Sequence, residues 1–100
     1  GAFTKLRGKM SKDADVVIHN RHGLKPQGDF VQIYEALPVE SNDETMYRTF
    51  NCGIGMVLSV YEKDVSKVLA QTGGEVIGEV RPGDGKIVIE SMFSGKTVNI

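Results

Sequence analysis

The sequence predicts an α+β fold, a mixed four- to five-stranded sheet with helices mainly on one face. Short β-branched runs alternate along the chain with segments of helical periodicity. Glycine- and proline-containing turns separate these segments, and no linker or internal repeat interrupts them. With 100 residues, 40% of them hydrophobic, the chain can build one modest core. We therefore expect residues 1–100 to form one domain.

The amino-terminal half is expected to begin with a strand and continue with a helix. The run DVVIH, residues 15–19, is a short β-branched segment bounded by polar and glycine residues, as is typical of a strand. Pro26 lies where a helix would start, and Pro38 would end it. Between them, apolar residues recur at the i, i+3, i+4, i+7 spacing of one helical face. These residues are Phe30, Ile33, Tyr34 and Leu37.

A second helix is expected to start at a capping box. Ser41 and Glu44 have the spacing at which each side chain can accept a hydrogen bond from the other residue's backbone amide. The helix that follows would carry Met46 and Tyr47.

Residues 54–60 are predicted to form an interior strand. Their odd-even alternation places four apolar residues on one face, and Val57 is apolar on the other face. This pattern is typical of a strand covered on both sides. The four residues of the first face are Ile54, Met56, Leu58 and Val60.

A third helix is expected to follow this strand. Its apolar stripe would consist of Val65, Val68 and Leu69. Acidic residues at 62 and 64 suit the positive amino end of a helix, and Gly73 or Gly74 can end it in a left-handed conformation.

Two further strands are predicted at EVIGEV, residues 75–80, and KIVIE, residues 86–90. The segment RPGDG between them favours a tight reversal, so we expect a hairpin. Residues 54–80 would form a right-handed crossover. In the tail, residues 91–100, two outcomes stay open: a last edge strand over residues 96–100, or fraying.

Composition limits the classes of partner. The net charge of -1 gives no field that would recruit nucleic acid or an anionic membrane. The only cysteine, Cys52, excludes an internal disulfide and fits a reducing cytoplasm. The sequence contains neither an apolar run long enough for a membrane helix nor a signal peptide. We expect a cytoplasmic protein without nucleic-acid or membrane partners.

The most specific segment is TMYRTFNCGIGMVLSV, residues 45–60. Arg48, Thr49 and Asn51 are polar groups carried to the turn where a helix and the next element meet. Gly53 and Gly55 lack side chains, which lets another backbone or a ligand approach closely at the start of the expected strand. We predict that these five residues form a substrate-binding wall.

The chemistry of this wall suits an anionic ribonucleotide. A guanidinium pairs bidentately with phosphate, and an amide both donates and accepts. Structural alternatives stay open: Arg48 pairing with an acidic neighbour, Asn51 capping the helix end, and the glycines making room for a crowded helix. Neither a P-loop nor a dinucleotide fingerprint is present.

No catalytic residue and no metal ligand is predicted. Cys52 has no histidine placed nearby in the sequence to activate it, and is expected to be a small buried apolar side chain. His19 and His22 lie near Asp13 and Asp15, but no third ligand occurs at a metal-site spacing. We expect both histidines to be solvated loop residues.

The run MYRTFNCGIGM, residues 46–56, resembles the signature near the carboxyl end of aminoimidazole ribonucleotide synthetase, the phosphoribosylformylglycinamidine cyclo-ligase of purine biosynthesis. The resemblance continues through residues 57–60, EKD at 62–64, LAQTGG at 69–74 and VIGEV at 76–80. Upstream, GAFTKL at 1–6 is similar to a glycine-rich helix entry of this family, and KPQGDFVQIYE at 25–35 to its proline-led helix. The likeness is weak over residues 7–24.

The resemblance implies an ATP-dependent ring closure. Such enzymes use ATP to activate the formyl oxygen of formylglycinamidine ribonucleotide, an internal nitrogen attacks that carbon, and phosphate leaves. Phosphorylation helps because an amide oxygen is a poor leaving group, and magnesium would neutralise charge. The implied cofactors of the full enzyme are ATP and magnesium, its substrate is this ribonucleotide, and it is a homodimer.

The resemblance covers the carboxyl-terminal portion of such an enzyme only. The amino-terminal domain and the histidine-bearing loop of the family are missing, so we expect residues 1–100 to be a partial carboxyl-terminal domain that is inactive alone. The alternative is a free-standing small-ligand-binding or assembly module derived from this domain. A missing strand would leave an unpaired sheet edge that recruits another chain.

Overall fold

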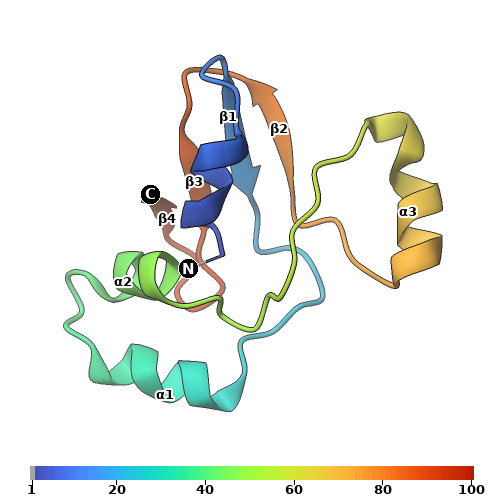
Figure 1. Cartoon of the computed structure of the whole chain (residues 1–100). Helices are drawn as coiled ribbons and strands as arrows, with labels where there is room; N and C mark the ends of the chain where they lie inside the picture. Colours follow the sequence, from blue (N-terminus) through green and yellow to red (C-terminus); the bar gives the residue numbers. More distant parts are fainter. Residues whose placement is uncertain (1) are drawn as a thin grey trace.

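The computed structural model describes residues 2–100 (Figure 1). In chain order the elements are the 3-10 helix η1 (Thr4–Lys9), strand β1 (Ala14–Ile18), helix α1 (Gly28–Ala36), helix α2 (Asn42–Thr49), the 3-10 turn η2 (Glu62–Asp64), helix α3 (Val65–Thr72), and strands β2 (Gly78–Pro82), β3 (Ile87–Glu90) and β4 (Thr97–Asn99).

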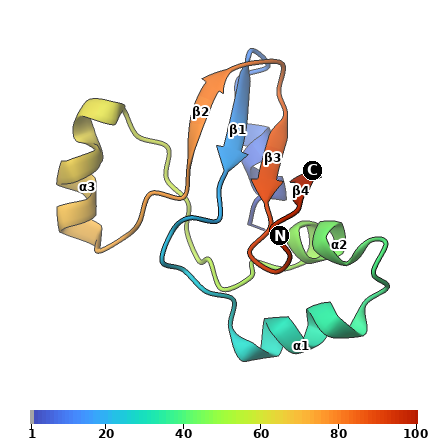
Figure 2. The same ribbon diagram turned by 180° about the vertical axis from the view of Figure 1, so that it is seen from behind.

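The strands form one mixed sheet in the order β2-β1-β3-β4. Strand β1 is antiparallel to β2 and parallel to β3, and β4 is antiparallel to β3. Figure 2 shows the four strands from behind, with α1 and α2 beyond one end of the sheet. The predicted α+β class and the mixed four-stranded sheet are confirmed. Strand β4 decides the open question about the tail, because residues 97–99 pair as an edge strand.

The core lies on one face of the sheet. Alternate residues of β1 and β3 point into it because successive strand side chains face opposite sides. Val16 pairs with Ile87, Ile18 pairs with Ile89, and all four are buried. The amino-terminal segment contributes Phe3 to this core, and α2 contributes Met46 and Tyr47. The buried apolar residues are Phe3, Val16, Ile18, Met46, Tyr47, Cys52, Ile54, Ile87, Ile89 and Ile100.

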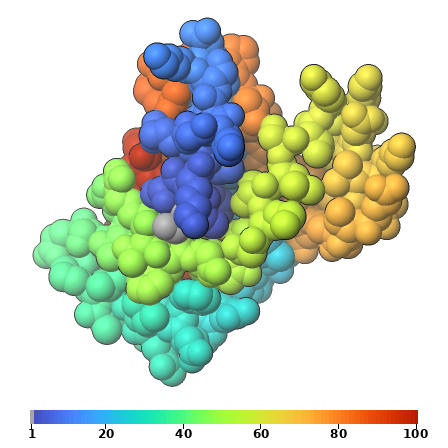
Figure 3. Space-filling view, in the orientation of Figure 1, coloured from blue at the N-terminus to red at the C-terminus, as the bar shows by residue number. Residues whose placement is uncertain are grey.

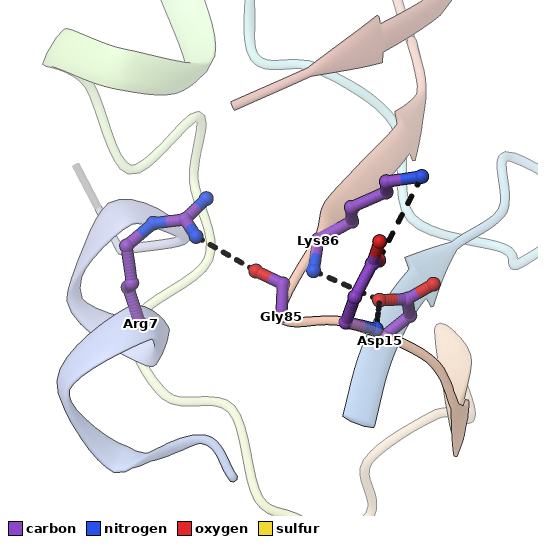
Figure 4. Close-up of polar contacts among 5 residues, drawn as sticks. Arg7, Asp15, Gly85 and Lys86 are labelled. Atoms are coloured by element: carbon purple, nitrogen blue, oxygen red, sulfur yellow. Dashed lines mark hydrogen bonds and ion pairs between the residues drawn. The ribbon is translucent and has the colours of Figure 1, made fainter. Parts of the chain in front are cut away.

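The predicted hairpin of β2 and β3 is wrong, although the reversal between them forms. Strand β1 lies between the two strands. Its Asp15 carboxylate accepts hydrogen bonds from the backbone N–H of Asp84 at 2.9 Å and of Lys86 at 2.8 Å, and Arg7 donates to the Gly85 carbonyl oxygen at 2.7 Å (Figure 4). The turn is therefore held by partners from the start of the chain, which separates its two strands.

The predicted strand over residues 54–60, and with it the crossover to β2, is also wrong. This segment is extended but pairs with no strand of the described chain. Ile54 is buried, whereas Met56 is 78% and Leu58 56% exposed. Alternation shows which side chains share a face, but a strand also needs a partner edge. Here the segment leads away from the sheet to α3 (Figure 1).

Helix α3 confirms the predicted third helix and stands beside the body of the protein (Figures 1 and 2). Gly73, with φ of 67°, ends it in the left-handed region as expected. None of its residues is fully buried. No helix among residues 2–100 has the length and apolar character needed to cross a membrane.

Helix α1 confirms the helix predicted after Pro26 and packs by its apolar face. Phe30 meets Phe50 edge to face, with ring centroids 6.1 Å apart, and Tyr34 stacks on Phe93 at 4.8 Å. These ring contacts place α1 against the end of α2 and the loop between β3 and β4.

Helix α2 forms as predicted, but its capping box does not. Ser41 is the N-cap residue without a side-chain capping bond, and its φ of -135° and ψ of 6° lie outside the β region that capping residues usually adopt. Glu44 pairs with Arg48 instead, and the side chain of Asn42 accepts from the Asp43 N–H.

A buried polar network fixes α2 to the loop between β3 and β4. The Ser91 hydroxyl donates to Asp43 Oδ1 at 2.5 Å, and the Ser94 hydroxyl donates to Oδ2 at 2.8 Å. The Met92 N–H donates to the Tyr47 hydroxyl oxygen at 2.8 Å. Burial raises the pKa of Tyr47 to about 12, so the phenol stays neutral. These bonds fix the position of α2 relative to the sheet.

The network yields a stability prediction. Ser91→Ala removes one of the two hydroxyl donors to a buried carboxylate, which costs about 1–3 kcal/mol because the group cannot regain water. Urea unfolding followed by circular dichroism measures this loss. Ser59→Ala, at an exposed serine, is the control and should leave the midpoint unchanged. An unchanged midpoint for Ser91→Ala would show that the network does not hold α2.

The turn after β2 yields a prediction about pH. The N–H groups of Lys86 and Asp84 lower the pKa of Asp15 below its ordinary value of 3.8. A depressed folded-state pKa stabilises the fold above the unfolded value, and this contribution is lost as pH falls through the folded-state pKa. Asp15→Ala should therefore be less stable than the parent chain near neutral pH, and the difference should shrink below pH 3.8.

Urea unfolding from about pH 7 to about pH 3 measures this difference. Asp84→Ala is the control, since the Asp84 side chain forms an exposed ion pair with Lys86 at 3.7 Å, and the variant keeps the backbone N–H that donates to Asp15. Equal pH profiles for Asp15→Ala and the parent chain would contradict the assignment.

Candidate functional site

Arg48 lies in the last turn of α2 and pairs with an acidic neighbour. Its Nε donates to Glu44 Oε1 at 2.8 Å, one helical turn earlier, and both side chains are about half exposed, at 49% and 50%. The structure thus shows the ion pair that the sequence left open as an alternative. An exposed pair of this kind contributes little to stability.

The turn after α2 is built by two consecutive residues with left-handed backbone. Cys52 has φ of 55° and Gly53 φ of 88°. The Asn51 side-chain oxygen accepts the Gly53 N–H at 2.8 Å, an Asx turn that stabilises this conformation. A left-handed cysteine is uncommon, and such strain persists where the surroundings compensate for it. Asn51 thus stabilises the turn that follows α2, while the C-cap residue of the helix is Phe50.

The burial of the Cys52 side chain compensates for this backbone strain. Its side chain is 2% exposed, and its sulfur lies 3.7 Å from the Met46 carbonyl oxygen. Burial raises the pKa of the Cys52 thiol to about 11, so the reactive thiolate is scarce at neutral pH. The expected burial of Cys52 is confirmed.

The two glycines differ in their reasons for being glycine. At Gly53 the backbone conformation favours glycine, since its φ of 88° is positive. Space does not require glycine there, because an added β-carbon would meet the Gln27 side chain at an ordinary contact distance of 3.6 Å. A β-carbon on Gly55 would meet nothing within 4 Å, so the space above it is open. Neither glycine starts a strand, since residues 54–60 are not one.

The structure brings the predicted site residues together as one exposed strip. We define the signature strip as Arg48, Thr49, Asn51, Gly53 and Gly55, all of which are exposed. The strip follows the end of α2 into the extended segment that leads to α3. Hollows of the described chain include one between residues 59–61 and α3 and another between residues 39–44 and residues 96–99, and neither is lined by a residue of the strip. The strip is an exposed surface, in the green segment that crosses the face shown in Figure 3.

The histidines differ from the expectation that both are solvated. His22 is 7% exposed, and its Nδ1 has no hydrogen-bond partner within the described chain. Burial lowers the pKa of His22 below its ordinary value. The loop is packed down because the Gly23 N–H donates to Glu75 Oε2, a residue distant in sequence. His19 is half-buried, and its Nδ1 accepts from the Arg21 N–H.

Metal-ligating residues do not gather in the part of the chain that the structure describes. Residues 2–100 contain no group of three or more His, Cys, Asp or Glu side chains that could hold a metal ion.

The sequence did not reveal the residues that position the strip. Asp43 and Tyr47 fix α2 through Ser91 and Met92, which are distant in the chain. The serines at 91 and 94 before Gly95 are typical of a turn, and this was the available signal. This turn signal does not indicate that the two serines bond to Asp43.

Comparison with known proteins identifies relatives of this chain. Residues 10–90 match the model of the family described as AIR synthase related protein, C-terminal domain. A phosphoribosylformylglycinamidine cyclo-ligase of Geobacter metallireducens is 62% identical over 40 residues, covering 35% of this chain and 12% of the relative. That of Geotalea daltonii is 51% identical over 47 residues, covering 42% and 14%. That of Geotalea uraniireducens is 47% identical over 66 residues, covering 61% and 18%.

The chain thus spans less than a fifth of the length of these relatives. No solved structure matches it. The family model covers most of the chain, including the signature strip, β1, β2 and β3. The chain therefore belongs to the family of AIR synthase related proteins and carries their C-terminal domain over residues 10–90.

Proposed function

We propose that this chain is a carboxyl-terminal portion of an ATP-dependent cyclo-ligase that closes the imidazole ring of aminoimidazole ribonucleotide from formylglycinamidine ribonucleotide. The observation that carries the proposal is the signature strip, in which all five predicted residues are exposed on one continuous segment. The relatives named phosphoribosylformylglycinamidine cyclo-ligase support the reaction. On its own the chain is proposed to be inactive, since it supplies one wall of the site.

Arg48 would bind the phosphate of the ribonucleotide. A guanidinium can pair bidentately with phosphate oxygens, and Arg48 lies in the last turn of α2. The pair of Arg48 and Glu44 is half exposed, and a phosphate can compete with Glu44 for the same cation. Asn51 and Thr49 follow on the same surface and offer donors and acceptors to a ribose or amide. Gly55 leaves open space for a close approach.

ATP and magnesium belong to the proposed full enzyme and not to this wall. The described residues do not fit a magnesium site, because the acidic side chains do not gather into a group of three. The proposal also includes a homodimeric, cytoplasmic full enzyme, which the family resemblance supports.

A second candidate is a free-standing assembly or small-ligand-binding module. The exposed apolar residues Met56 and Leu58 favour this candidate, because such surfaces recruit a partner. So does the outer edge of β2, with which no strand of residues 2–100 pairs. It differs from the first candidate in requiring no ribonucleotide.

Calorimetric titration distinguishes the two candidates. The folded chain is titrated with formylglycinamidine ribonucleotide and, separately, with magnesium-ATP. The cyclo-ligase proposal expects binding of the ribonucleotide, weakened roughly 10- to 100-fold by Arg48→Ala, because a hydrogen bond to a charged group contributes about 1.5–3 kcal/mol.

Arg21→Ala is the matched control, since Arg21 is another exposed arginine outside the strip, and it should leave the affinity unchanged. Circular dichroism checks that each variant is folded. Equal affinities of Arg48→Ala and the parent chain would remove Arg48 from the wall. A folded chain that binds neither ligand would favour the assembly module.

A further inference from the structure

The loop that leads from the end of β1 toward α1 buries one titratable side chain. We call residues 19–25 the His22 loop. Residues 21 and 23–25 are exposed, whereas His22 is 7% exposed. Its Nδ1 is enclosed by the chain's own atoms and has no hydrogen-bond partner within residues 2–100. Because the atom is enclosed, a partner outside the loop cannot reach it without moving the loop.

Glu75 holds the His22 loop in this closed position. Figure 2 shows the chain after β1 beside the connection from α3 to β2, and the Glu75 Oε2 of that connection accepts the Gly23 N–H. A β-carbon on Gly23 would lie 2.8 Å from Glu75 Oε1, so a side chain there would displace the carboxylate. The His19 N–H donates to the Ile77 carbonyl oxygen at 2.9 Å, which fixes the start of the loop to the same connection.

The closed loop favours the neutral form of His22. A neutral imidazole can leave Nδ1 without a proton, whereas the charged form carries an N–H on both ring nitrogens. In the closed loop the N–H at Nδ1 would have no acceptor. Charging His22 would therefore place both a charge and an unpaired donor in an enclosed position, and both are unfavourable.

Three charged or titratable groups act on His22: the His19 ring, with a centroid 5.8 Å away, Lys25 of the same loop, and Glu75. Burial and then His19 lower the pKa of His22, and Lys25 acts in the same direction. Glu75 and the Leu24 backbone oppose this change without cancelling it. In an open loop, water would solvate the imidazole and restore its ordinary pKa of 6.5.

We propose that the His22 loop is a proton-sensitive switch, in which proton uptake by His22 releases the loop from Glu75. At neutral pH and above, the imidazole stays neutral and buried, and the Gly23 N–H stays bonded. As the pH falls below 6.5, the open loop binds a proton more readily than the closed loop, so opening is favoured. One proton raises the opening equilibrium by at most about tenfold per pH unit.

The switch lies next to the signature strip. Gln27 follows directly on the His22 loop, and a β-carbon on Gly53 would meet its side chain at 3.6 Å. The segment that opening would release therefore extends from the connection before β2 to the turn after α2.

NMR of the isotope-labelled 100-residue chain, from about pH 8 to about pH 4.5, tests this switch. The His22 ring signals report its titration, and exchange of the Gly23 amide with water reports opening. Exchange is expressed as protection relative to the intrinsic rate, because that rate itself changes with pH. His22 should titrate below pH 6.5, and Gly23 protection should fall over the same range, by at most about tenfold per pH unit.

Three variants identify the titrating group. His22→Phe keeps a buried ring but cannot take up a proton, so Gly23 protection should lose its pH dependence. His19→Gln is the matched control, and its transition should persist at a higher pH because a neighbour that disfavours the charged His22 is removed. Glu75→Gln keeps an acceptor that does not titrate, and its transition should persist at a lower pH. Circular dichroism checks that every variant is folded.

Two results in the parent chain would overturn the proposal without any variant: titration of His22 at pH 6.5 or above, or constant Gly23 protection across the range. A transition that survives in His22→Phe would assign the proton to another group and overturn the proposal as well. The measurement uses no ribonucleotide, so failure of the switch leaves the proposed function unaffected, and the reverse.

Discussion

Pairing of β1 on both of its edges is the constraint on which the rest of the structure depends. Its neighbours β2 and β3 come from the last quarter of the chain, and the Asp15 carboxylate holds the turn that joins them. Everything between β1 and β2, including both central helices and α3, is an insertion anchored where these two strands end. Closing so long a segment costs entropy before any strand contact forms, so the sheet forms only with its core.

Within this insertion, α2 has the firmest attachment. Asp43, in the first turn of α2, and Tyr47, later in the helix, bond to the loop after β3, so α2 is fixed relative to the sheet. The chain then turns through the left-handed pair Cys52 and Gly53, with the cysteine buried and its neighbours exposed. That turn sends residues 54–60 away from the sheet. The same geometry that exposes the signature strip therefore prevents the following segment from pairing.

The sequence predicted local structure well and long-range partners poorly. Helical spacing located α1, and a β-branched run located β1. The end of α3 at Gly73 was predicted correctly, because a left-handed residue after a helix is a local requirement. The hairpin of β2 and β3 failed because the turn donates to Asp15 instead of joining adjacent strands. The capping box, the solvation of His22 and the strand at 54–60 failed for the same reason, since each depends on which distant residue becomes the neighbour.

The predicted site residues show the same difference between local structure and long-range partners. Their exposure on one segment could be read from the helix end and the glycines, whereas the ion pair of Arg48 was foreseen only as one of two alternatives.

Two exposed surfaces of the described chain differ in their chemistry. The segment with Met56 and Leu58 exposes apolar side chains, whereas β2 exposes the ion pair of Glu79 and Arg81. The apolar segment continues directly from Gly55, so a partner that covers it would also lie beside the signature strip. Helix α2, which carries Arg48, contacts β4 at the opposite end of the sheet order from β2. A ligand at Arg48 would therefore leave the outer edge of β2 uncovered.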